Sequence, residues 1–120
     1  MNKKIVAGLL IILAIGLGST LFFLSQSKPV ATQVVTLTPD GFKPEQITIK
    51  KGDKVTFKNT TGSPFWPASD IHPTHGIYPE FDPKEAIAKD STWTFKFDKA
   101  GSWGYHDHLA PYFMGRIIVK

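Results

Sequence analysis

Residues 101–119, GSWGYHDHLAPYFMGRIIV, decide the fold of this chain. Residues 102–108 and 116–119 predict two strands, and residues 109–115 are expected to form the loop between them. His106 and His108 are two positions apart, so their side chains share one face if the first strand is regular. This stretch therefore predicts two neighbouring strands that carry a pair of imidazoles close to a loop.

Further strands are predicted upstream, because polar and apolar residues alternate in several short segments. Turn residues rich in Gly, Pro and Asp separate these segments. The predicted strands cover residues 33–37, 46–50, 54–58 and 92–97. Six or seven short strands with turns between them predict an all-β domain, a small antiparallel sandwich.

A long irregular segment, residues 59–90, interrupts the strands and contains five of the nine prolines. It also carries several large apolar side chains, so we expect it to be ordered and to pack over one end of the domain. His72 and His75 lie in this segment, and they are the only histidines besides His106 and His108. Because the chain has no cysteine, a metal held by these two histidine pairs would be bound through nitrogen and oxygen.

The N-terminus has the features of a membrane segment. Residues 5–24 carry no charge, and their number is close to the ~20 needed to cross a hydrocarbon core as a helix. The two lysines before them favour an N-inside orientation. We expect residues 1–28 to form a signal-anchor and linker, with one domain, residues 29–120, on the extracytoplasmic side of the cell membrane. A cleaved signal peptide is the alternative, and the protein would then be secreted.

The charge of the domain argues against a nucleic-acid partner. Three of the 14 basic residues precede Pro29, so residues 29–120 have 11 basic against 10 acidic side chains. These basic residues are spread along the strands and do not form one basic face. The chain also lacks a nucleophile-elbow motif and a phosphate-binding glycine loop, so we do not expect an enzyme.

Two groups of segments resemble cupredoxin-like domains. The first group is residues 41–47 and 51–59, and the second is residues 101–106 and 114–119. The resemblance implies a Greek-key β-sandwich of the plastocyanin and azurin type that binds copper at one end. In the family a cysteine follows the tyrosine of this ending by two positions, and here that position is Asp107. Without a thiolate the implied copper site cannot be a blue one.

The histidine segments resemble a second group of proteins with the same fold. Tyr105-His106-Asp107-His108 is similar to the Tyr-His-x-His segment of multicopper oxidase domains, and His72-Pro73-Thr74-His75 is similar to their His-Pro-x-His segment. In those enzymes such pairs bind copper through imidazoles. The resemblance therefore implies the type of ligand, whereas one small domain lacks the further pairs of a trinuclear cluster.

Together these observations predict one mononuclear metal site with four imidazole ligands. Copper, as Cu²⁺, fits nitrogen ligands best on the affinity order, and Zn²⁺ also fits. The predicted ligands are His72, His75, His106 and His108. Secondary candidates are Asp107, Asp70, Glu80 and Met114. Each of Asp70, Glu80 and Asp82 would orient an imidazole or cap the loop, and Asp107 would be either a ligand or a structural residue.

The function we expect is the capture and delivery of copper, with a copper-donor or copper-acceptor protein as the partner. Imidazoles must be neutral to bind a metal, so the affinity should fall below about pH 6. Electron transfer is a second hypothesis. A metal-free interaction module and a small copper or zinc enzyme with an open coordination position are the others.

Overall fold

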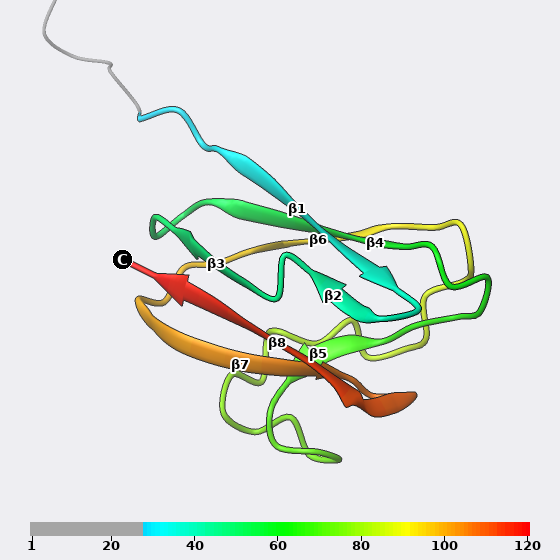
Figure 1. Cartoon of the computed structure of the whole chain (residues 1–120). Helices are drawn as coiled ribbons and strands as arrows, with labels where there is room; N and C mark the ends of the chain where they lie inside the picture. Colours follow the sequence, from blue (N-terminus) through cyan, green and yellow to red (C-terminus); the bar gives the residue numbers. More distant parts are fainter. Residues whose placement is uncertain (1–27) are drawn as a thin grey trace, which may run out of the picture.

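The computed structural model describes residues 28–120 and contains eight β-strands in two layers (Figure 1). The predicted anchor and linker, residues 1–28, lie outside the described residues except for Lys28. Among residues 28–120 no helix has the length and the apolar character that crossing a membrane requires. The strands are β1 (Thr32–Thr38), β2 (Gly41–Lys43), β3 (Gln46–Ile49), β4 (Lys54–Asn59), β5 (Pro67–Ser69), β6 (Trp93–Lys96), β7 (Gly101–Asp107) and β8 (Ala110–Val119).

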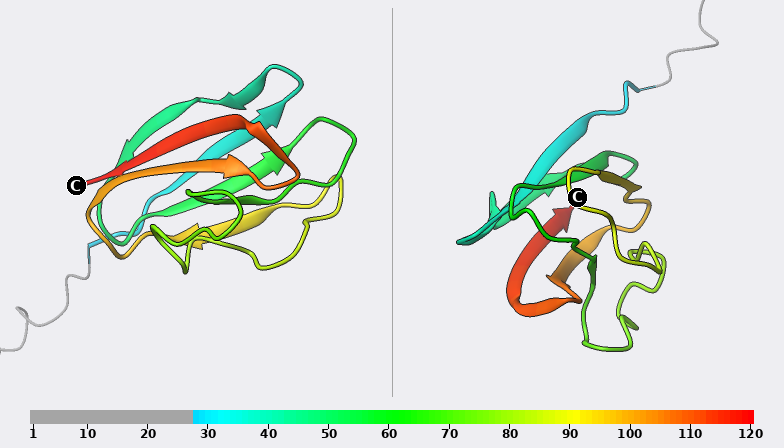
Figure 2. Two further views of the ribbon diagram at one scale, coloured as in Figure 1. Left: turned by 90° about the horizontal axis from the view of Figure 1, so that it is seen from below. Right: turned by 90° about the vertical axis from the view of Figure 1, so that its right-hand side faces the viewer.

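The strands form two four-stranded sheets, seen as separate layers in Figure 2. The first sheet has the order β2-β1-β4-β6, and the second has the order β3-β8-β7-β5. The all-β sandwich is confirmed, but two pairings, β1 with β4 and β3 with β8, are parallel, so the prediction of a purely antiparallel sandwich is wrong. The chain crosses between the layers before and after β3, and this crossing brings early and late strands side by side in the same direction.

The core lies between the two sheets, where alternate residues of each strand point inward. In β4, Val55 and Phe57 are fully buried, whereas Lys54 and Lys58 are exposed, as the polar–apolar alternation predicts. Aromatic rings from both sheets meet in the middle, and the ring centroids of Phe57 and Tyr105 lie 5.4 Å apart. A residue adjacent in sequence to a core residue therefore points to the outer face of its sheet.

The C-terminal hairpin differs from the prediction in its length. Residues 109–115, expected as a loop, belong mostly to the ten-residue strand β8. The turn after β7 is short, and Asp107 pairs directly with Ala110 across it. The pairing register shifts between His106 and Asp107, so β7 has an irregularity at the point where the histidines lie.

The segment between β5 and β6 is ordered, and it carries side chains into the molecule, as expected. Tyr78 and Phe81 are buried, and both contact Phe97 of the core. The first part of the segment, after Ser69, lies beyond β5 and β7 on the side away from the first sheet (Figure 1). It therefore covers the part of the outer face of the second sheet that β5 and β7 form.

Candidate metal centre

His106 points out of the sandwich. It follows Tyr105, whose ring is in the core, so the alternation of β7 directs its side chain to the opposite face. Its register partners are Ala68 on β5 and Met114 on β8. His106 is nevertheless only 2% exposed, and its Nδ1 lies 2.8 Å from Oδ1 of Asp70, in the loop that covers this face. A carboxylate can only accept, so Nδ1 donates and the lone pair is left on Nε2.

His75 is held in the same way by a second carboxylate. Its Nδ1 donates to Oδ2 of Asp82 at 2.8 Å, and the residue is 3% exposed. Asp82 also accepts hydrogen bonds from the indole N–H of Trp66 and the backbone N–H of Lys84, each at 2.8 Å. Burial alone would raise the pKa of the Asp82 carboxyl, but the hydrogen bonds from His75, Lys84 and Trp66 lower it to about 2. Asp82 is therefore an anion at neutral pH.

His108 and His72 complete the group from the less buried side. The backbone N–H of His108 donates to the Trp66 carbonyl at 2.7 Å, and its ring centroid lies 4.5 Å from that of Trp66. Its Nδ1 is 3.0 Å from Nε2 of His75. His72 is exposed, and its ring centroid lies 4.8 Å from that of His108 and 5.3 Å from that of His106. Four imidazoles, from the covering loop, from β7 and from the turn after β7, thus meet on one face.

The four rings can present one nitrogen each to a common point. These nitrogens all lie within 4.8 Å of one another. Among residues 28–120, Nε2 of His106 is a buried atom without a hydrogen-bond partner. Burial, and then the charge of the neighbouring imidazoles, lowers the pKa of His108 and favours its neutral form. Four imidazoles whose nitrogens lie this close together, two of them held by carboxylates, are the donor set that a divalent transition metal takes.

The secondary candidates lie in different places. Asp70 binds Nδ1 of His106, as described above, and its carboxylate is not one of the ligand atoms that cluster within 4.8 Å of one another. Asp107 is 3% exposed, and its Oδ1 accepts the backbone N–H groups of Trp66 at 2.9 Å and Leu109 at 3.1 Å. Its carboxylate thus ties the start of β5 to the turn after β7. Glu80 lies at the surface, with Oε2 3.4 Å from Nζ of Lys99.

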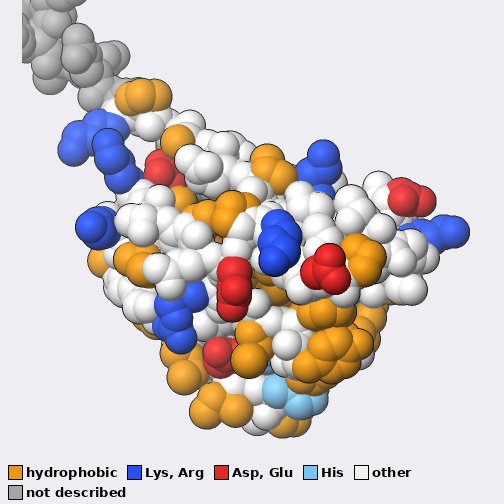
Figure 3. All heavy atoms as spheres, in the orientation of Figure 1, with side chains coloured by type: hydrophobic (Ala, Val, Ile, Leu, Met, Phe, Trp, Pro, Cys, Tyr) orange, Lys and Arg blue, Asp and Glu red, His pale blue; other side chains and the backbone are white. Residues whose placement is uncertain are grey.

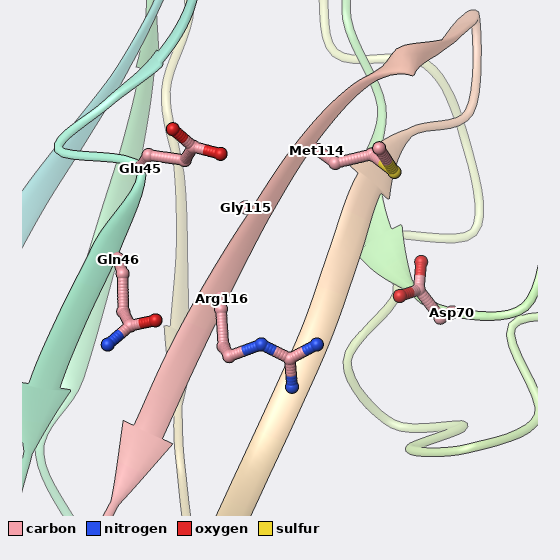
Figure 4. A pocket seen from close by; sticks show the side chains of 6 residues that line it. All are labelled: Glu45, Gln46, Asp70, Met114, Gly115 and Arg116. Carbon is pink, nitrogen blue, oxygen red and sulfur yellow. The ribbon is translucent and has the colours of Figure 1, made fainter.

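Met114 lies on the same outer face but faces solvent. It is 61% exposed and lines a surface pocket of about 390 Å³ together with Asp70 and Arg116 (Figure 4). The pocket runs over β8, from Glu45 and Gln46 on one side to Asp70 on the other. It therefore reaches the carboxylate that holds His106 but contains none of the four histidines.

Sequence reasoning missed two residues that support the site. Trp66 connects it, because its ring packs on His108 and its indole N–H binds Asp82; no feature of the sequence indicated this. Gly104 lies two positions before His106 on the same outer face, and a Cβ there would collide with Oδ2 of Asp70. A glycine inside a strand is a sign of such a close approach, so this residue could have been found.

The location of the group can be compared with the copper site that the family resemblance implies. The family resemblance places copper at one end of the sandwich, in the position that Asp107 holds here. The imidazoles lie near the end of β7 as well, but on the outer face of the second sheet, because the side chains of β7 alternate between its two faces. Asp107, at the family's position, accepts backbone N–H groups. The two histidine pairs do converge, as predicted.

Comparisons with known proteins agree with the fold. The family model of the cupredoxin-like domain matches residues 9–119. Chloroplastic plastocyanin of Tetradesmus obliquus is 32% identical over 88 residues, which are 66% of this chain and 58% of the relative. The chain thus spans less than two thirds of the length of that relative.

Two solved structures are similar to the described domain. A methionine mutant of amicyanin, solved with Cu(I), has a TM-score of 0.63 at 23% identity, with 74% of this chain and 82% of that chain covered. A purple cupredoxin from Nitrosopumilus maritimus has a TM-score of 0.63 at 17% identity, with 73% and 99% covered. At these identities the likeness shows the fold alone.

Proposed function

Because this chain belongs to the cupredoxin-like family and brings four imidazoles together, we propose that it captures and delivers copper outside the cytoplasm. The proposed ligands are His72, His75, His106 and His108. The observation that carries the proposal is the buried, unpartnered Nε2 of His106 within a group of nitrogens no more than 4.8 Å apart. A buried lone pair without a donor costs stability, and a bound cation removes that cost.

The chemistry of the group favours copper in the divalent state. Imidazole nitrogen binds Cu²⁺ more tightly than Zn²⁺ on the affinity order, and the chain has no thiolate to favour Cu⁺. Asp70 and Asp82 add negative charge behind two of the rings, and this raises the basicity of the ring nitrogens that face the metal. In support, the similar amicyanin has been solved with copper. Zn²⁺ remains the alternative cargo.

The distance along the sandwich between the first described residues and the histidines supports delivery to a partner protein. The backbone N–H of Lys54 donates to the carbonyl of Ala31 at the end of the sandwich where β7 begins, whereas the histidines lie near the end of β7. A membrane anchor over residues 1–28 would therefore leave the site facing away from the membrane. Histidine atoms reach the surface there among hydrophobic side chains (Figure 3). The exposed apolar residues closest in sequence to the histidines are Ile71, Ile77 and Leu109.

Spectroscopy of the full chain loaded with Cu²⁺ tests the proposal. We expect about one equivalent of bound copper, weak colour and the paramagnetic signal of a site without thiolate. The double variant His106→Ala, His108→Ala should lose this signal, while Tyr112→Phe, an exposed position, should keep it. A wild-type chain that binds no copper, or a double variant with an unchanged signal, contradicts the proposed site.

Electron transfer is the second candidate, because the similar amicyanin has been solved in both Cu(I) and oxidised forms. An imidazole site without thiolate reorganises more between the two states, so its electron exchange should be slow. Voltammetry of the loaded chain and the rate of copper transfer to a chelator separate the two functions. Rapid reversible reduction with slow copper release would favour electron transfer, and the opposite result would favour delivery.

A further inference from the structure

We infer that His72 is the exchangeable ligand, through which copper enters and leaves the site, while His75 and His106 stay fixed. This inference rests on the proposed function and adds the route of transfer. It comes from a difference in how the four rings are held, because two are buried and anchored and one is exposed without an anchor.

The fixed half of the site consists of His75 and His106. Both are at most 3% exposed, and in each ring Nδ1 is bonded to a carboxylate at 2.8 Å. These bonds fix the tautomer and the ring plane before any metal binds. Moving either ring out of the site would break a charge-assisted hydrogen bond and expose a buried side chain.

His108 is held less firmly than this pair, but its ring is still confined. It is half-buried, packs on Trp66 at 4.5 Å and contacts His75 through Nδ1 at 3.0 Å. Its backbone N–H is bonded to the Trp66 carbonyl. Rotation of the ring away from the group would therefore cost the contact with Trp66.

His72 is the least firmly held of the four rings. It is exposed, and among residues 28–120 its ring has no hydrogen-bond partner, and the aromatic rings close to it are the other three imidazoles. The backbone around it is nevertheless tied down, because His75 N–H donates to the Ile71 carbonyl at 2.7 Å and Ile77 N–H donates to the Asp70 carbonyl at 3.0 Å. His72 can thus leave by rotation of its own side chain, without opening the loop.

The exchange itself is a ligand substitution. The lone pair of an incoming imidazole, amine or carboxylate forms a bond to the metal as the bond to the His72 nitrogen breaks. The metal keeps its oxidation state, and the released ring is hydrated because it already faces solvent. The other three rings hold the metal until further donors of the acceptor replace them.

The first test measures copper extraction from the full chain by excess nitrilotriacetate. We expect His72→Ala to keep copper bound with an affinity loss of about tenfold, and to release it at least tenfold faster than the wild type. His106→Ala should lose more than a hundredfold in affinity. An extraction rate of His72→Ala within twofold of the wild type overturns the inference while leaving the copper site intact. If the wild type binds no copper, the inference and the proposed function fail together.

The second test needs no metal. Nitrogen NMR of the metal-free chain should show fixed Nδ1–H tautomers for His75 and His106 and rapid averaging for His72. A His72 ring as rigid as that of His75 would contradict the inference. Because His72 is exposed, His72→Ala should unfold at the same temperature as the wild type. Equal unfolding temperatures would show that the faster copper extraction does not come from misfolding.

Discussion

The inner and outer faces of β7 each carry one buried polar atom without a hydrogen-bond partner in the described domain, and the surroundings of these two atoms differ. Tyr105 and His106 are adjacent, point to opposite faces, and each has a buried polar atom without a partner among residues 28–120, Oη in one and Nε2 in the other. The Tyr105 ring lies among aromatic rings, with Phe42 at 4.8 Å and Phe81 at 5.4 Å. The unpaired hydroxyl there only costs stability, whereas Nε2 of His106 faces further imidazole nitrogens that can share a cation.

The next residue shows what a satisfied polar group looks like at the same place. Asp107 is as buried as His106, but its Oδ1 accepts two backbone N–H groups. Burial of a polar side chain therefore does not by itself identify a binding site. The distinguishing feature is whether its hydrogen-bonding capacity is already used within the protein.

The largest effect on stability is expected from Asp107→Ala. The substitution leaves the backbone N–H groups of Trp66 and Leu109 without their charged acceptor, so the free energy of unfolding should fall by about 3 kcal/mol. Chemical denaturation of the metal-free chain measures this. Asp40→Ala, in the exposed turn between β1 and β2, is the control and should change it by less than about 0.5 kcal/mol. An equally small change in Asp107→Ala would show that the carboxylate is not structural.

On the outer side, Asp82→Ala should cause the largest loss of copper affinity among the supporting residues. It removes the acceptor that fixes His75, and loss of such a partner typically costs about 10–100-fold in metal affinity. Competition titration with a chelator measures the loss. Glu80→Ala, which removes an exposed carboxylate paired with Lys99, is the control and should leave the affinity unchanged. Equal affinities of the two variants would mean that Asp82 does not support the site.

The sequence predicted the two histidine pairs and six of the eight strands, all except the three-residue strands β2 and β5, because alternation and histidine spacing are local features. It did not predict which carboxylates would hold the rings. Asp70 and Glu80 both flank the loop histidines, and only the loop path sends Asp70 to His106, 36 positions away, and Glu80 to solvent. The sequence also left open which face of the sheet receives the site. It depends on Tyr105 occupying the core, which is a property of the folded sandwich.

Gly104→Ala tests whether the strand surface must be bare for His106 to be oriented. The added Cβ would collide with Oδ2 of Asp70 and push this carboxylate away from the ring, so copper affinity should fall by about tenfold. Gly76→Ala is a matched control, because a Cβ there would meet only Thr74, at 3.7 Å. If Gly104→Ala binds copper as well as Gly76→Ala does, the link between Asp70 and His106 is not needed for binding.

Tyr105→Phe tests the inner side, where we expect the smallest effect and no change in copper affinity. Removing an unpaired buried hydroxyl should raise the free energy of unfolding at pH 7 by about 1 kcal/mol or leave it unchanged. Loss of more than about 1 kcal/mol would show that the hydroxyl has a partner. Tyr112→Phe, at a position that is 75% exposed, is the control.

The pH dependence of stability gives this variant a second readout. Burial raises the pKa of the Tyr105 phenol above its ordinary value, which is about 10. Below pH 10 both the folded and the unfolded chain keep the proton, and the contribution of the protonated phenol to the free energy of unfolding is fully present. Above it the unfolded chain loses the proton first, so the free energy of unfolding falls as the pH rises, by at most about 1.4 kcal/mol per unit for one group. Tyr105→Phe should reduce that slope, and a slope equal to that of Tyr112→Phe would mean that the phenol ionises as easily in the folded chain.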